Sequence, residues 1–334
     1  MASTKGDRTS TSLRLSHGLT RRKLAGLLAL LSSPGRSPGQ RLPRVLIDTD
    51  AANYFDDQFA LAYAATSGAE LRLEAVYAAP FTNSRVSDPA QGMQLSFEEI
   101  GSVLEATGVE VDVRIRRGAD RVIPAPGQAV PSPAAEDIVQ QAANARPADC
   151  ILVSIGPATN AASALLMDPA LAGRITVVWL GGTPHQFPTA SEYNLRQDVH
   201  AARVLLDSGV RLLHVPAQGI AEKLSVTLPD LERRLAGRSP IADFLLSRVK
   251  RHAPVHGGEV GSPVPLAIWD MAAIAAVVAP GFVEFQSAPS PILGPDLRWS
   301  IDSGRHTVDV ATRISASAVF DDFFRKLETS PESA

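Results

Sequence analysis

The sequence predicts an α/β fold with a Rossmann-like, mostly parallel β-sheet flanked by helices. From Arg44 onward, short apolar runs typical of strands alternate with amphipathic segments of helical length. Alternation of this kind is typical of βαβ units, in which a helix connects two parallel strands. The 334 residues, 45% of them hydrophobic and 20% charged, are enough for one large domain or two ordinary ones. Because no linker interrupts residues 44–330, we expect one domain there, preceded by an extension over residues 1–43.

Each predicted strand is a short apolar run, and most are followed by an amphipathic segment that predicts a helix. The strands are expected over Val45–Asp48, Leu71–Ala78, Val111–Ile115, Ile151–Ile155, Thr176–Leu180 and Leu212–Val215. The helices are expected near Asp56–Thr66, Leu95–Thr107, Ala134–Ala143, Ala158–Met167 and Val199–Leu206.

Beyond residue 220 the pattern changes, and we expect extra C-terminal helices and a short antiparallel pair. The stretch LPDLERRLAGRSPIADFLLSRVKRH predicts one or two helices, and HGGEVGSPVP is a loop rich in glycine and proline. The stretch LAIWDMAAIAAVV predicts an apolar helix that opens on Asp270. Alternating runs near Arg298–Asp302 and Thr307–Thr312 predict the antiparallel pair.

The first 43 residues are rich in Ser, Arg, Gly and Pro. Within them, Arg21 and Arg22 precede a short apolar run, so that TRRKLAGLLALLSSPG resembles a twin-arginine export signal. We expect a disordered basic extension on a cytoplasmic protein, with export through this signal as the alternative. No apolar run reaches the roughly 20 residues that a membrane-spanning helix requires.

Composition excludes several classes of function. The net charge of −3, from 32 basic and 35 acidic residues, does not favour nucleic acid as a partner. The chain has a single cysteine, Cys150, in an apolar run. One cysteine excludes an internal disulfide and a cysteine-based zinc site, and a buried structural thiol is expected.

An acidic cluster is the strongest chemical signal in the chain. The stretch VLIDTDAANYFDDQFALAY, residues 45–63, holds Asp48, Asp50, Asp56 and Asp57. One carboxylate would cap the helix that follows, but four at one strand end require a cation, protonation or a bound polyol. Oxygen ligands without Cys or His suit Ca²⁺ or Mg²⁺, and Ca²⁺ tolerates an irregular carboxylate cage best. The alternative is a solvated acidic rim.

Three later stretches also end strands or open helices, where ligands bind in parallel α/β sheets. They are VSIGPATNAASAL at 153–165, GGTPHQFPTASEYNLRQDVHAA at 181–202 and PLAIWDMAAI at 265–274. Each is weak alone, since a Gly-Pro turn or a capping aspartate is common. Together and in order, the four stretches resemble the inosine-uridine-preferring nucleoside hydrolase family, over about Val45 to Val278. The matching segments are Asp48-Thr49-Asp50 with Asp56-Asp57, GPATN at 156–160, SEYN at 191–194 with DVHAA at 198–202, and WD at 269–270.

The resemblance implies a Ca²⁺-dependent hydrolase that cleaves the N-glycosidic bond of a ribonucleoside, with a purine base expected. By position, it implies Asp50, Asp57 and Asp270 as metal ligands, joined by the main-chain carbonyl of Ile155. Asp50 would also act as general base on water, and Asp56 would bind the ribose 2′-hydroxyl. Glu192 and Asn194 would hold the 5′ and 3′ side of the ribose, and Asp48 would orient the ligands. The resemblance also implies a homodimer or homotetramer. From the net charge and the lack of a long apolar run, we expect no nucleic-acid or membrane partner.

The first departure from the family is a longer loop. Five residues, Ala51 to Phe55, separate Asp50 from Asp56, whereas the family usually has three. We expect the loop to bulge and Asn53 to point into the site, where Asn53 and Asp56 could exchange roles. In APFTNSR at 79–85, Asn83 and Arg85 are candidate substrate contacts, with a plain loop role as the alternative.

The second departure is Trp269, which replaces a histidine that protonates the leaving base in many family members. A large π-face could activate a purine by stacking instead, while the alternative is a core tryptophan. His185, His252 and His256 are candidate substitute acids, although surface histidines are more common, and we include His185 among the substrate contacts. His200 and His214 are expected to be structural.

Two other functions remain open from the residues alone. A haloacid-dehalogenase-like Mg²⁺ phosphatase also begins with a strand and Asp-x-Asp, so that Asp48 would be its nucleophile and Asp50 its acid/base. That class gives SEYN no place. The other is a non-catalytic Ca²⁺-dependent nucleoside or sugar binding protein, which the missing histidine favours.

Overall fold

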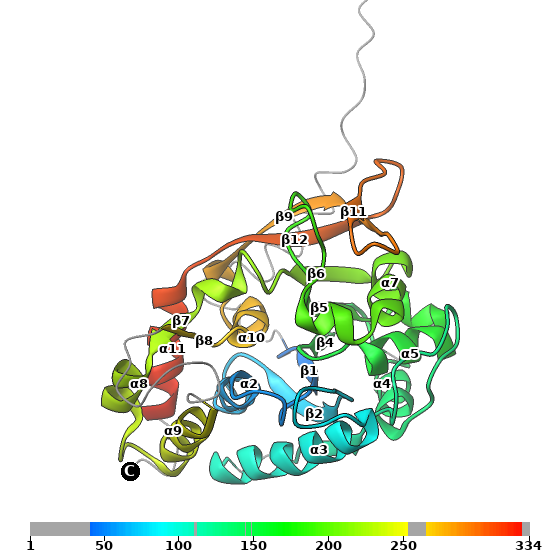
Figure 1. Ribbon diagram of the computed structural model, residues 1–334. Helices are drawn as coiled ribbons and strands as arrows, with labels where there is room; N and C mark the ends of the chain where they lie inside the picture. The colour runs from blue at the N-terminus through cyan, green and yellow to red at the C-terminus, as the bar shows by residue number, and fades with distance from the viewer. Residues whose placement is uncertain (1–40, 110–111, 144, 148, 253–264, 329–334) are drawn as a thin grey trace, which may run out of the picture. The chain divides into compact units, whose positions relative to one another are not determined.

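A mostly parallel eight-stranded sheet forms the centre of the computed structural model, which describes residues 41–109, 112–143, 145–147, 149–252 and 265–328 (Figure 1). The strand order is β3-β2-β1-β4-β5-β6-β12-β9, and every neighbouring pair is parallel except β12 and β9. The strands are β1 (Arg44–Thr49), β2 (Arg72–Ala78), β3 (Arg114–Arg117), β4 (Cys150–Ser154), β5 (Thr176–Leu180), β6 (Arg211–Val215), β9 (Val283–Pro289) and β12 (Thr307–Ile314). The predicted fold class is confirmed.

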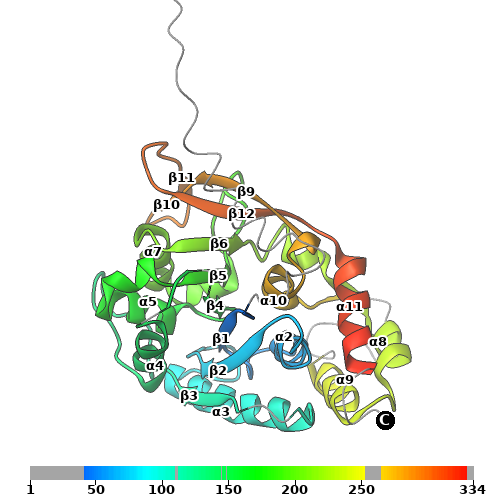
Figure 2. The ribbon, with the colours of Figure 1, turned by 180° about the vertical axis from the view of Figure 1, so that it is seen from behind.

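Helices cover both faces of the sheet, because the central strands are apolar on both sides (Figures 1 and 2). In β1, Val45 and Ile47 belong to one apolar core and Leu46 to the other. The first core includes side chains of α2 (Asp56–Ala65), α3 (Pro89–Ala106), α8 (Leu228–Leu235), α9 (Pro240–His252), α10 (Met271–Val278) and α11 (Ala316–Glu328). The second includes side chains of α4 (Pro133–Ala142), α5 (Thr159–Met167) and α7 (Val199–Asp207).

Short elements complete the described chain. The helix α6 (Tyr193–Gln197) lies between β5 and α7 in the sequence. Two small antiparallel pairs join β7 (Ser225–Thr227) to β8 (Pro265–Ala267) and β10 (Ile292–Leu293) to β11 (Trp299–Ser300). The 3₁₀ turns are η1 (Pro169–Gly173), η2 (Ala221–Lys223) and η4 (Pro280–Phe282).

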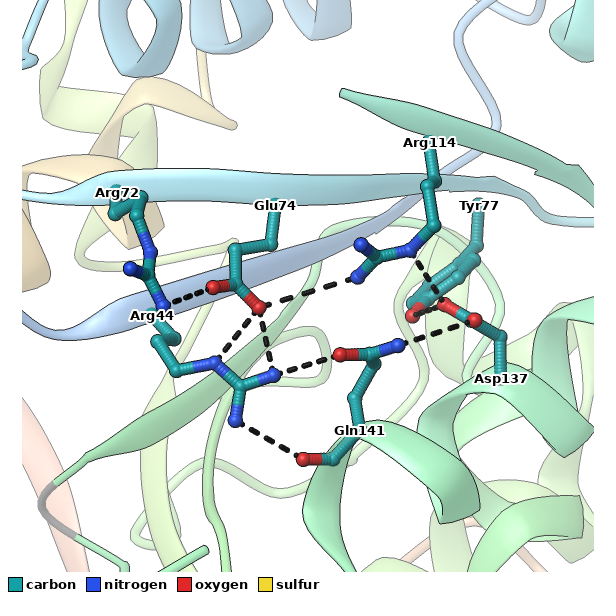
Figure 3. Close-up of polar contacts among 7 residues, drawn as sticks. All are labelled: Arg44, Arg72, Glu74, Tyr77, Arg114, Asp137 and Gln141. Carbon is teal, nitrogen blue, oxygen red and sulfur yellow. Dashed lines mark hydrogen bonds and ion pairs between the residues drawn. The ribbon is translucent and has the colours of Figure 1, made fainter. Parts of the chain in front are cut away.

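A polar network joins β1, β2 and β3 to α4 (Figure 3). Arg44 Nε donates to Glu74 Oε2 at 2.7 Å, and Arg44 Nη2 donates to Gln141 Oε1 at 2.6 Å. The Tyr77 hydroxyl donates to Asp137 Oδ2 at 2.7 Å. The ladder between β1 and β2 skips Glu74, since Val45 pairs with Leu73 and Leu46 with Ala75. This bulge turns Glu74 toward the arginines.

The predicted strands and helices agree with the structure to within a few residues, with two exceptions. Helix α3 begins at Pro89, six residues before the predicted Leu95, because Asp88 accepts a hydrogen bond from Ala90 N and proline is favoured in the first turn. The short antiparallel pairing expected late in the chain is present, but the runs 298–302 and 307–312 do not pair with each other. Instead β12 pairs with the seven-residue β9, which offers a longer ladder, and β11 pairs with β10.

The predicted extension is largely outside the described residues, as are Arg21, Arg22 and most of the loop HGGEVGSPVP. The domain boundary and the choice between cytoplasm and export therefore stay predictions. Within the described part of the chain, none of the helices is both long enough and apolar enough to span a bilayer.

Candidate functional site

A cavity of about 440 Å³ lies at the carboxyl ends of the central strands, where parallel α/β sheets bind ligands. Most of the residues predicted from the sequence line it: Asp50, Asn53, Asp56, Asp57, Asn83, Arg85, Ile155, Glu192, Asn194, His252, Trp269 and Asp270. Other lining residues were not predicted: Tyr54, Ser84, Leu180, Tyr193, Arg196, Ala217, Gln218 and Glu222.

Three buried carboxylates converge in this cavity because α2 packs against α10. Asp56 and Asp57 form the first turn of α2, and Asp270 is the residue at which α10 begins. One oxygen atom from each of the three lies within 4.8 Å of the others. The Thr49 hydroxyl at the end of β1 donates to Asp57 Oδ1 and orients that carboxylate. Residues more than 200 positions apart thus supply one cluster.

Asp50 follows β1 and is only 2% exposed. Its Oδ2 atom has no hydrogen-bond partner among the residues that the structure describes. Its Oδ1 atom lies against the turn after β4, where a Cβ on Gly156 would approach to 2.7 Å. Glycine at 156 therefore allows the Asp50 carboxylate its position, and Oδ2 is left to contact a ligand.

Burial of these carboxylates makes their charged forms costly. Burial first, and the neighbouring carboxylates second, raise the pKa values of Asp50, Asp56 and Asp270 well above their usual range. Burial raises the pKa of Asp57 to about 6, against the hydrogen bond from Thr49. A cation would reverse this balance by favouring the ionised forms. The cluster fits a hard divalent cation, because all of its potential metal ligands are carboxylate oxygens. The unpaired Asp50 Oδ2 atom adds a further oxygen.

The predicted backbone ligand, Ile155, lies beside Asn194. Asn194 Nδ2 donates to Ile155 O at 2.7 Å and to Leu180 O at 3.2 Å. A carbonyl oxygen has two lone pairs, so Ile155 O retains acceptor capacity beside this bond. Because both neighbours of Nδ2 are acceptors, the amide orientation of Asn194 is fixed.

Glu192 holds the turn in front of α6. Its Oε1 accepts from Asn194 N at 3.1 Å, and its Oε2 accepts from Gly182 N at 2.8 Å and Leu195 N at 3.2 Å. Burial raises the pKa of Glu192, and these backbone donors oppose that shift. Glu192 thus caps α6 and also lines the cavity.

The loop between Asp50 and Asp56 is fastened to the loop after β2 through Asn53. Asn53 Oδ1 lies 3.0 Å from Asn83 Nδ2 and 3.1 Å from the Tyr193 hydroxyl. Asn83 Oδ1 accepts from Arg85 N and Val86 N, so the Asn83 side chain closes its own turn. The two-residue excess is therefore absorbed by an ordered contact between two loops.

An aromatic wall, formed by Tyr54, His252 and Trp269, lies on another side of the cavity. The Tyr54 ring centroid lies 5.8 Å from that of Trp269 and 5.7 Å from that of His252. Trp269 is half-buried and packs against the first apolar core, so it contributes to that core as well as to the cavity wall. Tyr54 was missed by the sequence reasoning, although it lies inside the unusually long loop.

Two of the predicted site residues that the structure describes, His185 and Asp48, do not line the cavity. His185 Nε2 lies 3.1 Å from His214 Nδ1, and His214 Nε2 lies 2.8 Å from Gly181 O, so that His214 donates to the carbonyl and accepts from His185. Burial lowers the pKa of His185 to about 4 and that of His214 to about 3. A substrate contact by His185 stays a prediction. His256 lies outside the described residues.

Asp48 is the other residue behind the cavity wall. It is completely buried, and its Oδ1 accepts from Asn160 Nδ2 at 2.8 Å. Burial raises its pKa to about 7, against that hydrogen bond. A nucleophile must reach the substrate, so this position does not suit the attacking residue of a phosphatase. The position suits a residue that holds the neighbouring strand ends in place.

Comparison with known proteins identifies the family. The family model described as inosine-uridine preferring nucleoside hydrolase matches residues 45–322, most of the chain. The chain belongs to this family. The match continues beyond Val278, where the resemblance in the sequence motifs ended, and covers β9, β12 and part of α11.

Curated relatives match this nucleoside hydrolase family member over only part of their length. The pyrimidine-specific ribonucleoside hydrolase RihA from Salmonella newport (strain SL254) is 28% identical over 152 residues, which cover 41% of this chain and 49% of that protein. RihB from Shigella flexneri serotype 5b (strain 8401) is also described as pyrimidine-specific. It is 32% identical over 123 residues, which cover 34% of this chain and 39% of that protein. The matches thus span about half the length of these relatives or less.

Solved structures share the nucleoside hydrolase fold over nearly their whole length. The plant nucleoside hydrolase PpNRh1 has a TM-score of 0.70 and 22% identity, and covers 86% of this chain and 100% of its own. The purine-preferring ribonucleoside hydrolase from Gardnerella vaginalis has a TM-score of 0.66 and 20% identity, and covers 87% and 100%. At these identities the likeness concerns the fold.

Proposed function

We propose that this family member hydrolyses the N-glycosidic bond of ribonucleosides, with Ca²⁺ as its cofactor. The observation that carries the proposal is the cluster of Asp56, Asp57 and Asp270 oxygens in one cavity with the unpaired Asp50 Oδ2. Asp50, Asp57, Asp270 and the Ile155 carbonyl would hold the ion. Ca²⁺ accepts an irregular, carboxylate-rich set of ligands more readily than Mg²⁺, which demands near-octahedral geometry.

The chemistry follows from the charge that builds on the sugar. Cleavage passes through an oxocarbenium-like transition state, which nearby carboxylates stabilise. A bound divalent cation supplies Lewis acidity, which lowers the pKa of water. Asp50 accepts a proton from the water as its oxygen bonds to C1′, and the C1′–N bond breaks with its electron pair going to the base. Asp56 holds the 2′-hydroxyl, and the Glu192–Asn194 segment holds the 5′ and 3′ side.

We propose a purine as the preferred base. Tyr54 and Trp269 offer two aromatic faces to a base, and their area suits the larger bicyclic ring. His252 lies beside Tyr54 in the same cavity and is the candidate proton donor to the leaving base. The names of the relatives include both pyrimidine-specific and purine-preferring enzymes and do not decide between the two bases. The proposal of a purine therefore rests on the aromatic wall.

The test is release of p-nitrophenol from p-nitrophenyl riboside, and of free base from inosine, with Ca²⁺ present. We expect turnover, and a fall in kcat of about 10²–10⁴-fold for Asp50→Asn, the usual contribution of a general base. The matched control is Asp302→Asn, which changes an exposed aspartate far along the sequence. Nucleoside binding without turnover would instead indicate a Ca²⁺-dependent binding protein. Activity on phosphate esters alone would reject both functions.

We also propose a homodimer or homotetramer, as the family resemblance implies. Light scattering on the purified protein measures the mass of the assembly directly. A mass equal to one 35.4 kDa chain across micromolar concentrations would contradict the proposal.

A further inference from the structure

We infer that Arg85 and Arg196 bind a phosphate on the 5′ carbon of the ribose, so that the protein prefers ribonucleoside 5′-monophosphates to neutral nucleosides. The inference rests on the proposed function, because it uses the ribose orientation given there. It concerns only the group that the substrate carries beyond the ribose.

The two arginines contrast in charge with the rest of the cavity. Five of the carboxylates that line it are buried: Asp50, Asp56, Asp57, Glu192 and Asp270. The sixth, Glu222, is exposed and lies 3.9 Å from Lys223 Nζ. Arg85 and Arg196 are also exposed and line the same cavity. Within the described ranges of the chain, neither guanidinium has a carboxylate within the 4.0 Å of an ion pair. A ligand with hydroxyls at one end and an anion at the other would complement this arrangement.

Each guanidinium is held in place while most of its donors stay available. Arg85 Nη2 donates to the carbonyl of Asn53 at 2.8 Å. Arg196 Nη1 donates to Ser191 Oγ at 3.3 Å. A guanidinium has five N–H donors in a planar fork that matches phosphate oxygens. One neutral hydrogen bond therefore orients each group without neutralising it.

The segments that carry the two arginines are bound to each other. The Tyr193 hydroxyl donates to Thr82 O at 2.6 Å. Thr82 N donates to Gln197 Oε1 at 2.9 Å, and Gln197 Nε2 donates back to Thr82 O at 3.2 Å. The loop before Arg85 is thus fastened on both sides of Arg196 in α6. The two arginines belong to one ordered rim.

In the orientation given under the proposed function, the 5′ carbon of the ribose would face this rim. The 2′ and 3′ hydroxyls lie on one face of the sugar, and the base and the 5′ carbon lie on the other. When the hydroxyls contact the buried carboxylates, the base and the 5′ carbon point away from them. The proposed function places the 5′ and 3′ side of the ribose at Glu192 and Asn194, and Arg196 follows them in the short helix α6.

An alternative explanation for the two arginines is that their positive charges offset the negative potential of the acidic cluster. Arg196, for example, opposes the upward shift in the pKa of Glu192. Such a field acts on neutral and phosphorylated substrates alike. A phosphate contact acts only on the phosphorylated one, so the ratio of the two activities separates the explanations.

The experiment compares inosine with inosine 5′-monophosphate, using the full chain with Ca²⁺ and measuring kcat/KM by release of hypoxanthine. We expect the monophosphate to be preferred by the unaltered protein. The preference should fall about tenfold in Arg85→Gln and in Arg196→Gln, and further in the double variant, since a charged hydrogen bond is worth about 1.5–3 kcal/mol. The matched control is Arg238→Gln, an exposed arginine after α8, which should keep the ratio.

Calorimetric binding to the Asp50→Asn protein gives a second measurement that needs no turnover. The monophosphate should bind more tightly than inosine, and the arginine double variant should lose that difference. Equal affinity for the two ligands, or an equal loss of both in the arginine variants, overturns the inference. Turnover of inosine with no preference for the monophosphate overturns it while leaving the proposed function in place. If binding favours the monophosphate but neither compound is cleaved, the inference holds and the hydrolase function fails.

Discussion

The side-chain amide of Asn194 donates a 2.7 Å hydrogen bond to the main-chain carbonyl of Ile155. This bond joins α6 to the turn after β4, and the same amide also donates to Leu180 O at the end of β5. It therefore positions a predicted backbone ligand and a predicted ribose contact relative to each other.

Replacement of Asn194 tests that relationship. Asn194→Asp would place a carboxylate against two carbonyl oxygens, so we expect a loss of about 1–3 kcal/mol in the free energy of unfolding. Asn194→Ala only removes the donor and leaves room for water, and should cost less. Urea unfolding in the presence of a chelator measures both. An aspartate variant as stable as the unaltered protein would contradict the proposed orientation.

The repulsion among the carboxylates predicts an effect of the metal on stability. Without divalent cations, Asp270→Asn should raise Tm, because it removes one of the charges crowded beside Asp56 and Asp57. For the unaltered protein, Ca²⁺ at 100 times its Kd should stabilise by about 2.7 kcal/mol. The variant should lose most of this gain. Thermal scans with EDTA and with added Ca²⁺ provide the comparison, and an identical Ca²⁺ response of the two proteins would reject the assigned site.

Truncation of the aromatic wall tests the choice of base. Trp269→Ala should reduce kcat/KM for inosine about tenfold, since stacking on an aromatic ring is worth about 0.5–1.5 kcal/mol beyond the area it buries. Uridine, with its smaller ring, should lose less. Trp269→Phe keeps a ring and should restore most of the activity. A larger loss for uridine than for inosine would favour a pyrimidine substrate.

The buried His214 predicts a stability that depends on pH. Burial holds the pKa of His214 at about 3, below its ordinary 6.5, so the unfolded chain binds more protons between these values. Stability should therefore fall as pH decreases from about 6.5 toward 3, and His214→Gln should make that fall shallower by up to about 1.4 kcal/mol per pH unit. Unfolding titrations at several pH values give the slope. Parallel slopes for the two proteins would show that His214 does not titrate in this way.

The network of Figure 3 should affect stability and leave catalysis alone. Tyr77→Phe removes one hydrogen bond to Asp137, which should cost about 1 kcal/mol. Glu74→Gln leaves Arg44 and Arg72 without their counter-charge and should cost more. Because none of these residues lines the cavity, kcat should stay within about twofold. A large change in kcat at unchanged stability would assign these residues a different role.

Sequence alone determined the framework of this protein, because its signals are local. The apolar runs of β1, β2, β4, β5 and β6 follow from the pattern along a few residues, and the starts of α2 and α10 follow from their aspartates. The ordered motifs were enough to predict the family, which the family match confirmed. Together with the two departures from the family pattern, they named twelve of the twenty residues that line the cavity.

Tertiary structure decided which side chains meet there. The packing of α2 against α10 brings Asp270 to Asp56 and Asp57, and the contact of Asn53 with Asn83 settles the course of the long loop. It places Tyr54 and Arg196 in the cavity, turns His185 to His214, and gives β12 the partner β9. Such contacts depend on the distances between elements far apart in the chain. Those distances are set by the packing of the whole core, which no short stretch of sequence encodes.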